Sequence, residues 1–400
     1  MSAKIAIVGS GPAGCYTAQA LLKRAPEAEV DLIDALPVPY GLVRYGVAAD
    51  HQGTKGVTRQ FDRLFTRQGA RFFGNLRIGQ DLSLADLRQA YDAVVLATGL
   101  GADLRLGIEG DDLPGVIGAA RLTRALYEHP DAAGLPDLGA HPVVIGTGNV
   151  AIDILRLLAK TPAELHGSDL GPGPTAWLAG QGIRQITVLG RSAAEAARFS
   201  PVMVKELGEL SRIDIQVQNP AADPEEALNR AAAASHGPLP VVFRFATRPL
   251  TLAPRPEGLA LTVETPEGRD QIAATSVITA IGFDCDGALD RAGLLAEAEA
   301  GAVSGQGRLY TAGWFRTGPT GALPQCREEG QALAARLLAE VTPDPARPGR
   351  ARLADLPGVV DFDHWAQIDA HERAEAAPDR CRRKLARRDE LLRPALSQNA

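Results

Sequence analysis

Two glycine-rich segments of this 400-residue chain have the spacing of loops that bind a pyrophosphate. The first follows an apolar run at 4–9 and begins a stretch at 14–24 that predicts a helix. In GxGxxG the glycines permit a tight turn, close approach of the pyrophosphate, and close helix–strand packing. The N-terminus of the helix favours an anion. Asp34 ends the next strand, where a carboxylate can accept hydrogen bonds from an adenosine ribose. We therefore predict a dinucleotide site formed by Gly9, Gly11, Pro12, Ala13, Gly14 and Asp34.

The second segment, GTGNVA at 146–151, has the GxGxxA form and lies between a predicted strand at 142–146 and a predicted helix at 149–160. The next strand, 185–190, ends in Gly190-Arg191. An acidic side chain at this position would repel a ribose 2′-phosphate. An arginine attracts that phosphate, which favours NADPH; a surface arginine without a ligand is the alternative. The predicted contacts are Gly146, Gly148, Asn149, Val150, Arg191 and Ser192.

The length, net charge and cysteine content of the chain argue against several classes of protein. A chain of 400 residues exceeds one ordinary hydrophobic core, so two domains are expected. The formal net charge of -6 argues against a nucleic-acid binder. No apolar run approaches the roughly 20 residues of a membrane span, and the N-terminus has no signal-peptide pattern, so we expect a cytoplasmic protein. The 4 cysteines are isolated, which disfavours a disulfide framework, a metal site and a CxxC redox pair.

The order of the predicted elements indicates one nucleotide domain inserted into another. Buried strands are expected at 91–99, 276–283 and 308–314, and antiparallel strands at 241–246 and 260–264. A long surface loop is expected at 161–184. The predicted fold class is α/β, with two Rossmann-like, doubly wound, three-layer nucleotide-binding domains.

The chain resembles the adrenodoxin-reductase type of ferredoxin–NADP reductase from residue 4 to the RCRRKL segment at 380–385. The matching blocks are IAIVGSGPAG (5–14), PYGLVRYGVAADH (39–51), RFFGN (71–75), YDAVVLATG (91–99), VVIGTGNVAIDILRLL (143–158), VFRF (241–244) and GWFRTGPTG (313–321). The resemblance implies non-covalent FAD, hydride transfer from NADPH, and single-electron transfer to a ferredoxin-type iron–sulfur protein. It also implies an FAD domain at 1–105 and 302–400 and an NAD(P)H domain at 106–301. We expect a monomer or weak dimer.

The same resemblance assigns roles to particular residues. It implies that Gly41, Leu42 and Arg44 lie along the flavin and its pyrophosphate, and that Gly313, Trp314 and Gly321 flank the isoalloxazine ring. The helix after GPTG would direct its N-terminus at the reduced flavin. His51 and Glu206 match a catalytic histidine and glutamate that the family places near the nicotinamide, where they would assist orientation or proton balance. The alternatives are a hydrogen-bonded structural histidine and a solvated helix glutamate. Further cofactor contacts implied are Thr98, Gly99, Gly318 and Thr320.

The chain departs from this family pattern at two places. Ser192 follows Arg191 where the family has a second arginine, and a family glutamate falls on Met203, so NADH use becomes an alternative to NADPH. After GPTG the chain has Ala322-Leu323-Pro324-Gln325, and the proline removes one backbone N–H from the expected helix start.

The departures leave two alternative functions open, and the lack of cysteine clusters argues against two others. An NADH-preferring flavoprotein reductase with another acceptor, or a catalytically impaired nucleotide-binding partner protein, fits the departures. A glutamate-synthase-like electron-feeding chain and a flavin disulfide reductase both need cysteine clusters that the sequence lacks. A stripe formed by Arg59, Arg63, Arg67 and Arg71 would suit an acidic ferredoxin, or it is a solvated helix face.

Overall fold

The computed structural model describes residues 2–300, 305–354 and 356–393. The chain divides into two compact units, which are treated separately below. The first unit comprises Met1–Ala102, His129–Asp131 and Phe283–Ala400, and the second comprises Asp103–Glu128 and Ala132–Gly282. Two short paired strands, β5 (Ala102–Asp103) and β15 (Phe283–Asp284), lie where the chain passes between the units.

Within the described residues, the first unit has a five-stranded parallel sheet of order β16-β4-β1-β2-β3. The central strand β1 pairs on one side with the next strand in the chain and on the other with β4, so its C-terminal end is a topological switch point. The strands are β1 (Lys4–Val8), β2 (Glu29–Ile33), β3 (Arg71–Phe73), β4 (Ala93–Leu96) and β16 (Arg308–Thr311).

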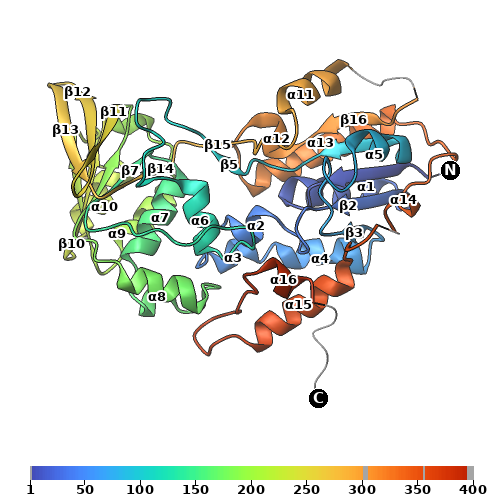
Figure 1. Ribbon diagram of the computed structural model, residues 1–400, viewed down its shortest axis with the longest axis horizontal. Helices are drawn as coiled ribbons and strands as arrows, with labels where there is room; N and C mark the ends of the chain where they lie inside the picture. Colours follow the sequence, from blue (N-terminus) through green and yellow to red (C-terminus); the bar gives the residue numbers. More distant parts are fainter. Residues whose placement is uncertain (1, 301–304, 355, 394–400) are drawn as a thin grey trace. The chain divides into compact units, whose positions relative to one another are not determined.

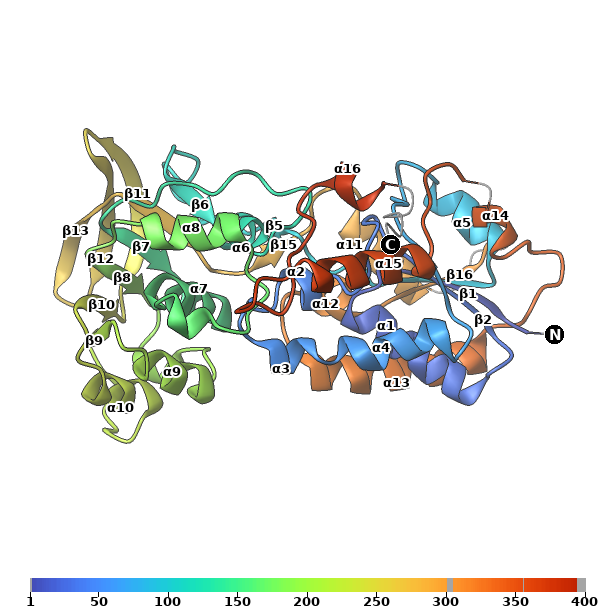
Figure 2. The same ribbon diagram turned by 90° about the horizontal axis from the view of Figure 1, so that it is seen from below.

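Helices cover both faces of this sheet (Figure 1). Ile5 and Ile7 point to the face that packs against α1 (Pro12–Arg24) and α13 (Leu323–Glu340), whereas Ala6 and Val8 point to the face covered by α5 (Leu84–Ala90) and α11 (Arg291–Ala300). Figure 2 shows α13 alongside α1. The first unit is therefore a three-layer α/β/α domain, as predicted.

The remaining helices of the first unit surround the carboxyl end and the edge of its sheet. Phe61 of α4 and Trp365 of α15 share the core that also contains the ring of Tyr40. These helices are α2 (Leu42–Tyr45), α3 (Gln52–Lys55), α4 (Thr58–Thr66), α12 (Gly313–Thr317), α14 (Ala351–Ala354), α15 (Phe362–Ala374) and α16 (Arg388–Leu391).

As far as the structure describes it, the second unit has a six-stranded parallel sheet of order β6-β14-β7-β8-β10-β9. A three-stranded antiparallel sheet, β11-β12-β13, packs on one of its faces through Leu252, Leu261 and Val263. The parallel strands are β6 (Val116–Gly118), β7 (Pro142–Ile145), β8 (Ile186–Leu189), β9 (Ile213–Gln218), β10 (Leu239–Arg244) and β14 (Ser276–Thr279). The antiparallel strands are β11 (Arg248–Arg255), β12 (Gly258–Thr265) and β13 (Gly268–Ala274). The helices are α6 (Ala119–Leu126), α7 (Asn149–Ala159), α8 (Pro172–Gly180), α9 (Pro201–Gly208) and α10 (Ala227–Ala234).

The structure differs from the sequence-based expectation at three segments. The expected loop at 161–184 contains α8. This helix starts with a proline in its first turn, where the backbone N–H would have no partner within the helix. The expected antiparallel strand at 241–246 is the parallel strand β10, since its apolar residues fill an interior position between β8 and β9. Residues 283–300 belong to the first unit rather than the second, because α11 buries Ala298 in the first unit's core beside Leu309.

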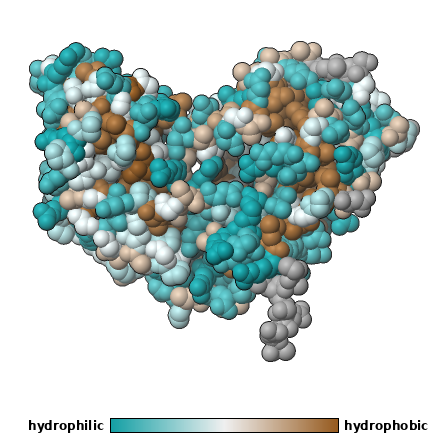
Figure 3. Space-filling view, viewed as in Figure 1, coloured by the Kyte–Doolittle hydropathy of each residue, from teal (hydrophilic) through white to brown (hydrophobic). Residues whose placement is uncertain are grey.

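Figure 3 shows hydrophilic residues interleaved with apolar ones over the surface of each unit in this view. Among the residues that the structure describes, no helix has the length and apolar character to cross a membrane.

A buried carboxylate links β2 to two neighbouring segments of the first unit. Asp31 is fully buried and accepts a 2.7 Å hydrogen bond from the Tyr91 hydroxyl, and the Arg350 Nη2 lies 3.0 Å from its other oxygen. Burial raises the pKa of Asp31 from 3.8 to about 6, although the Arg350 charge and the Tyr91 hydroxyl act in the opposite direction. The folded state therefore holds this proton more tightly than the unfolded chain does.

This raised pKa predicts a specific pH dependence of stability. The contribution of Asp31 is fully present below pH 3.8 and is lost as the pH rises through about 6. We expect the free energy of unfolding of the first unit to fall by about 2 kcal/mol more in the wild type than in Asp31→Asn between pH 4 and 7. Urea unfolding at several pH values measures this, with Asp112→Asn, which removes an exposed carboxylate, as control. Parallel pH profiles for wild type and Asp31→Asn would contradict it.

Candidate functional site

The first glycine loop has no room on one side and open space on the other. A Cβ at Gly9, whose φ is +109°, would lie 2.2 Å from the Ala97 carbonyl oxygen, and a Cβ at Gly14 would lie 2.0 Å from the Gly9 carbonyl oxygen. At Gly11, by contrast, no described atom lies within 4 Å of the added Cβ. Gly11 caps α1 without a side-chain hydrogen bond, so the N–H groups of Ala13 and Gly14 face this space. The loop therefore fits a phosphate group.

The second glycine loop repeats this geometry in the second unit. A Cβ at Gly146, whose φ is +126°, would lie 2.2 Å from the Ala280 carbonyl oxygen, while the corresponding position at Gly148 has no described atom within 4 Å. Gly148 caps α7 without a side-chain hydrogen bond, and Val150 lies half-buried in the first turn of that helix. This loop also fits a phosphate.

Two polar residues predicted to contact a nucleotide have protein partners. The Asp34 carboxylate accepts hydrogen bonds from Ser10 N at 2.9 Å, Ser10 Oγ at 2.5 Å and Leu36 N at 3.0 Å. Burial raises the pKa of Asp34, and these hydrogen bonds oppose that rise. In the other loop, Asn149 Oδ1 accepts a 2.7 Å hydrogen bond from Ser200 N. Both side chains thus shape their loops, and a carboxylate with about four acceptor positions retains one for a ribose.

The segment after β2 lies directly against the first loop. Tyr40 has a φ of +82°, which is uncommon for a bulky residue, and its N–H donates to the Ser10 carbonyl at 3.1 Å. A Cβ at Gly41 would approach the Gly11 Cα to 3.3 Å. Leu42 follows with 38% of its surface exposed.

Arg44 is placed differently from the expectation that its side chain lies along a cofactor. Its guanidinium is buried, ion-paired with Glu372 of α15, and flanked by the Tyr45 and Trp365 rings, each 5.0 Å from Cζ. Burial opposes the charge on Arg44, but the Glu372 carboxylate outweighs it and raises the pKa of Arg44. Arg44 therefore joins the 41–45 segment to α15 and does not present its charge to solvent.

Glu372 is the residue of this region that the sequence analysis missed. It is fully buried and also accepts hydrogen bonds from Arg382 Nη1 and Leu385 N, each at 2.9 Å. Nothing in its neighbouring residues distinguishes it from an exposed helix glutamate, so no sequence signal pointed to it.

The GW and GPTG segment completes the surroundings of the first loop. Gly313, with φ of +57°, lies so close that a Cβ there would be 2.5 Å from the Ala13 Cβ. The Trp314 ring stacks on Phe283 at 5.6 Å between centroids. Gly318 and Gly321 also have positive φ, and Thr320 and Gly321 are exposed. On the other side of Gly9, Thr98 is exposed and Gly99 is half-buried.

The helix after GPTG begins beside this surface. Gln325 Oε1 accepts a 3.0 Å hydrogen bond from Ala322 N, and Pro324 has no N–H to offer. Within the described residues, the backbone N–H groups of Leu323 and Gln325 donate to no backbone acceptor and remain for an anion. The proline therefore reduces the donors at this helix start without abolishing them.

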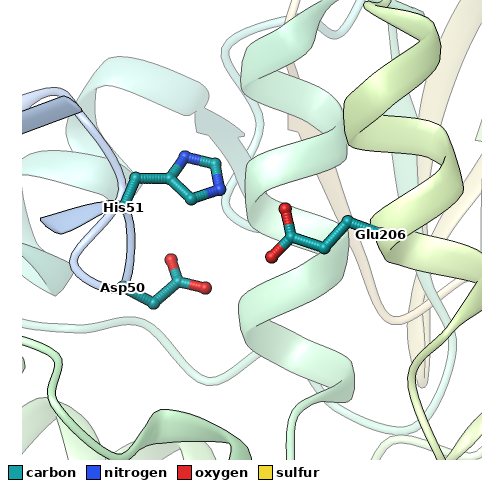
Figure 4. Close-up of side chains that lie close together, drawn as sticks. All are labelled: Asp50, His51 and Glu206. Atoms are coloured by element: carbon teal, nitrogen blue, oxygen red, sulfur yellow. The ribbon is translucent and has the colours of Figure 1, made fainter. Parts of the chain in front are cut away.

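The two residues predicted to be catalytic lie in different units (Figure 4). His51 is half-buried next to Asp50, at the start of α3, and its N–H donates to the Ala48 carbonyl at 3.0 Å. Glu206 lies on α9, where its Oε1 is 2.7 Å from Nη2 of the fully buried Arg156 and 3.6 Å from Lys160 Nζ. Arg156 of α7 and Lys160, the residue after α7, thus hold the Glu206 carboxylate in place.

The strand end predicted to meet a 2′-phosphate is well ordered by backbone bonds. Arg191 and Ser192 are both exposed after β8, and Ser192 O accepts a 2.9 Å hydrogen bond from Ala246 N. Met203 is half-buried on α9. The geometry brings Arg191, Ser192, Gly146, Gly148 and Asn149 to one edge of the second sheet.

Comparisons with known proteins agree with this architecture. The family model "Pyridine nucleotide-disulphide oxidoreductase" matches residues 3–309. The chain is 40% identical over 406 residues to cindoxin reductase of Citrobacter braakii, covering 95% of this chain and 88% of that protein. It is 32% identical to human mitochondrial NADPH:adrenodoxin oxidoreductase, covering 98% and 91%. The structure of Mycobacterium tuberculosis FprA in complex with NADPH superposes with a TM-score of 0.89 at 30% identity, covering 99% and 100%.

The buried Arg44–Glu372 pair makes a prediction about stability. Glu372→Gln leaves the buried guanidinium without its countercharge, so we expect the free energy of unfolding of the first unit to fall by about 3–5 kcal/mol. Glu375→Gln, at an exposed position just past the same helix, is the matched control. Urea unfolding measures both, and a Glu372→Gln curve that overlays the control would show that the pair is not a buried ion pair in solution. Replacing both partners by methionine should recover part of the loss.

Proposed function

The chain belongs to the pyridine nucleotide-disulphide oxidoreductase family and, within it, to the ferredoxin and adrenodoxin reductases, and we propose that it is a FAD-dependent NADPH–ferredoxin reductase. The observation that carries this assignment is the pair of glycine loops. Each unit has one loop, each loop has an open glycine at an uncapped helix N-terminus, and each lies at a switch point of a parallel sheet. Two dinucleotides, FAD in the first unit and NADPH in the second, match two such loops.

When bound, FAD accepts a hydride from NADPH and releases the electrons singly to an iron–sulfur protein. The chain contributes binding and orientation. Ala13 N and Gly14 N would bind the FAD pyrophosphate, and the remaining acceptor position of Asp34 would bind its ribose. Gly41 and Gly313, which both touch the first loop, would let the ring lie close to the backbone, and Leu42 would lose its exposure beneath it.

Two features of the chain would manage charge during the reaction. The N-terminus of α13, an 18-residue helix, favours negative charge through its dipole and through the N–H groups of Leu323 and Gln325. His51 would hold or release a proton near the nicotinamide.

Glu206, held by Arg156 and Lys160, would act as a hydrogen-bond acceptor that orients the nicotinamide amide. Arg44 is in this proposal a positioning residue that holds the 41–45 segment.

The proposal also covers the electron acceptor, the oligomeric state and the location of the protein. Arg59 and Arg63 of α4, Arg67 just after it and Arg71 are exposed. None of them forms an ion pair within the described residues, which supports an acidic ferredoxin as partner. We expect a monomer or weak dimer. None of the four cysteines, all within the described residues, forms a disulfide, which suits a cytoplasmic location.

An NADH-preferring reductase is the second candidate, because Ser192 offers only a neutral hydrogen bond to a 2′-phosphate. The deciding measurement is reduction of the purified holoprotein under anaerobic conditions, followed by flavin absorbance, with NADPH and NADH compared. We expect bleaching by both nucleotides, with NADPH effective at about tenfold lower concentration. Stimulation of turnover by an added ferredoxin tests the acceptor. A flavin that neither nucleotide reduces would overturn the central proposal.

The two open glycines allow the nucleotide assignments to be separated. Gly11→Ala adds a methyl group where the protein has space but the FAD pyrophosphate needs it, so we expect about tenfold less bound flavin in a normally folded protein. Gly148→Ala should keep its flavin and weaken NADPH binding by a similar factor.

Gly9→Ala is the contrasting variant, because its Cβ would meet the Ala97 carbonyl oxygen at 2.2 Å and should destabilise the fold itself. Circular dichroism, flavin content after gel filtration and NADPH titration measure the three outcomes. Loss of flavin in Gly148→Ala with retention in Gly11→Ala would reverse the assignment of the two units.

A further inference from the structure

The segment between β8 and α9 is hydrogen-bonded to the second glycine loop at two points. Arg198 N donates to the Thr147 carbonyl at 3.0 Å, and Ser200 N donates to Asn149 Oδ1 at 2.7 Å. Just before the segment, Gly146 N donates to the carbonyl of Leu189, the last residue of β8, at 2.9 Å. The start of the segment is close as well, since a Cβ at Gly190 would lie 3.1 Å from the Thr147 Cγ2. Arg191 at the beginning and Arg198 near the end therefore flank the same loop.

Further backbone bonds fix the beginning of this segment. Thr247 N donates to the Gly190 carbonyl, and Ala246 N donates to the Ser192 carbonyl, each at 2.9 Å. Phe199, next to Arg198, is buried and anchors the other end. The positions of the two arginine backbones relative to the loop are thus set by the second unit alone.

The segment carries two arginines and one glutamate. Arg191 and Arg198 are exposed, and neither forms an ion pair with any residue that the structure describes. The only acid between them, Glu195, accepts a hydrogen bond from Ala222 N at 3.1 Å. Hydrogen bonds from backbone N–H groups, its own and that of Ala222, lower the pKa of Glu195. This carboxylate is therefore engaged with the backbone beside Ala222.

We propose that Arg198 is a specificity-determining residue that supplies, together with Arg191, the positive charge for the 2′-phosphate of NADPH. A phosphate dianion is held best by two cationic donors, and Ser192 provides none. Arg198 lies six positions further along the segment, yet its backbone is bonded to the glycine loop that receives the dinucleotide. The inference rests on the proposed function, since it concerns the nucleotide that the second unit binds.

The test compares nucleotides that differ only in the 2′-phosphate. Isothermal titration of the holoprotein with NADP⁺, NAD⁺ and 2′,5′-ADP gives the affinities without any turnover. Arg198→Met, which keeps the apolar stem, should weaken NADP⁺ and 2′,5′-ADP binding by about tenfold and leave NAD⁺ binding unchanged. Arg198→Lys should restore most of the difference. The preference of the wild type for NADP⁺ should also fall as salt concentration rises.

Arg184→Met is the matched control. Arg184 is exposed on the same unit, but it precedes β8 and so lies at the opposite edge of the sheet from Arg191. Unchanged NADP⁺ affinity in Arg198→Met would overturn the inference. An equal loss of NADP⁺ and NAD⁺ would do the same, because it would indicate a structural role. A wild type that binds NADP⁺ and NAD⁺ equally well would overturn the inference alone, whereas a wild type that binds neither would refute the proposed function.

Discussion

A steric constraint at the ends of two central strands organises both units. The chain leaves β1 at Gly9 and β7 at Gly146 with positive φ, and at each turn a carbonyl oxygen of the adjacent strand segment, from Ala97 or Ala280, occupies the place of a Cβ. Only glycine can make these turns. They bring the start of a helix against the carboxyl edge of the sheet, so that uncapped N–H groups face open space. Anion binding follows from that arrangement.

Buried charge secures the loop that lies over the first of these turns. Arg44 ties the 41–45 segment to Glu372, more than three hundred residues later in the chain, and the Tyr45 and Trp365 rings exclude water from the pair. Such a pair is weak as a source of stability but costly to break singly. Helix α15, near the end of the described chain, is therefore joined to the segment that lies against the flavin loop, although it supplies no part of that loop.

The fold was predictable wherever a local pattern was sufficient. Apolar runs before GSGPAG and GTGNVA predicted β1, β7 and their helices, and the interruption between them predicted one domain inserted into another. Where the pattern was ambiguous, tertiary packing decided. The run at 241–246 suits either kind of strand, and only its position between β8 and β9 makes it parallel. The Gly- and Pro-rich stretch at 161–184 concealed α8, because proline at a helix start resembles proline in a loop.

By itself, the sequence determined that the protein binds two dinucleotides, because each glycine loop follows a strand and begins a helix. The motif blocks determined the family. What the tertiary structure decided is which polar side chains are left for a ligand. Asp34 and Asn149 accept hydrogen bonds from Ser10 and Ser200. Arg44 is ion-paired with Glu372, whereas Arg198 forms no ion pair with a described residue and its backbone is bonded to the second loop. The physical reason is that hydrogen-bond and charge partners come from residues distant in the chain, and no local spacing records which pairs the fold brings together.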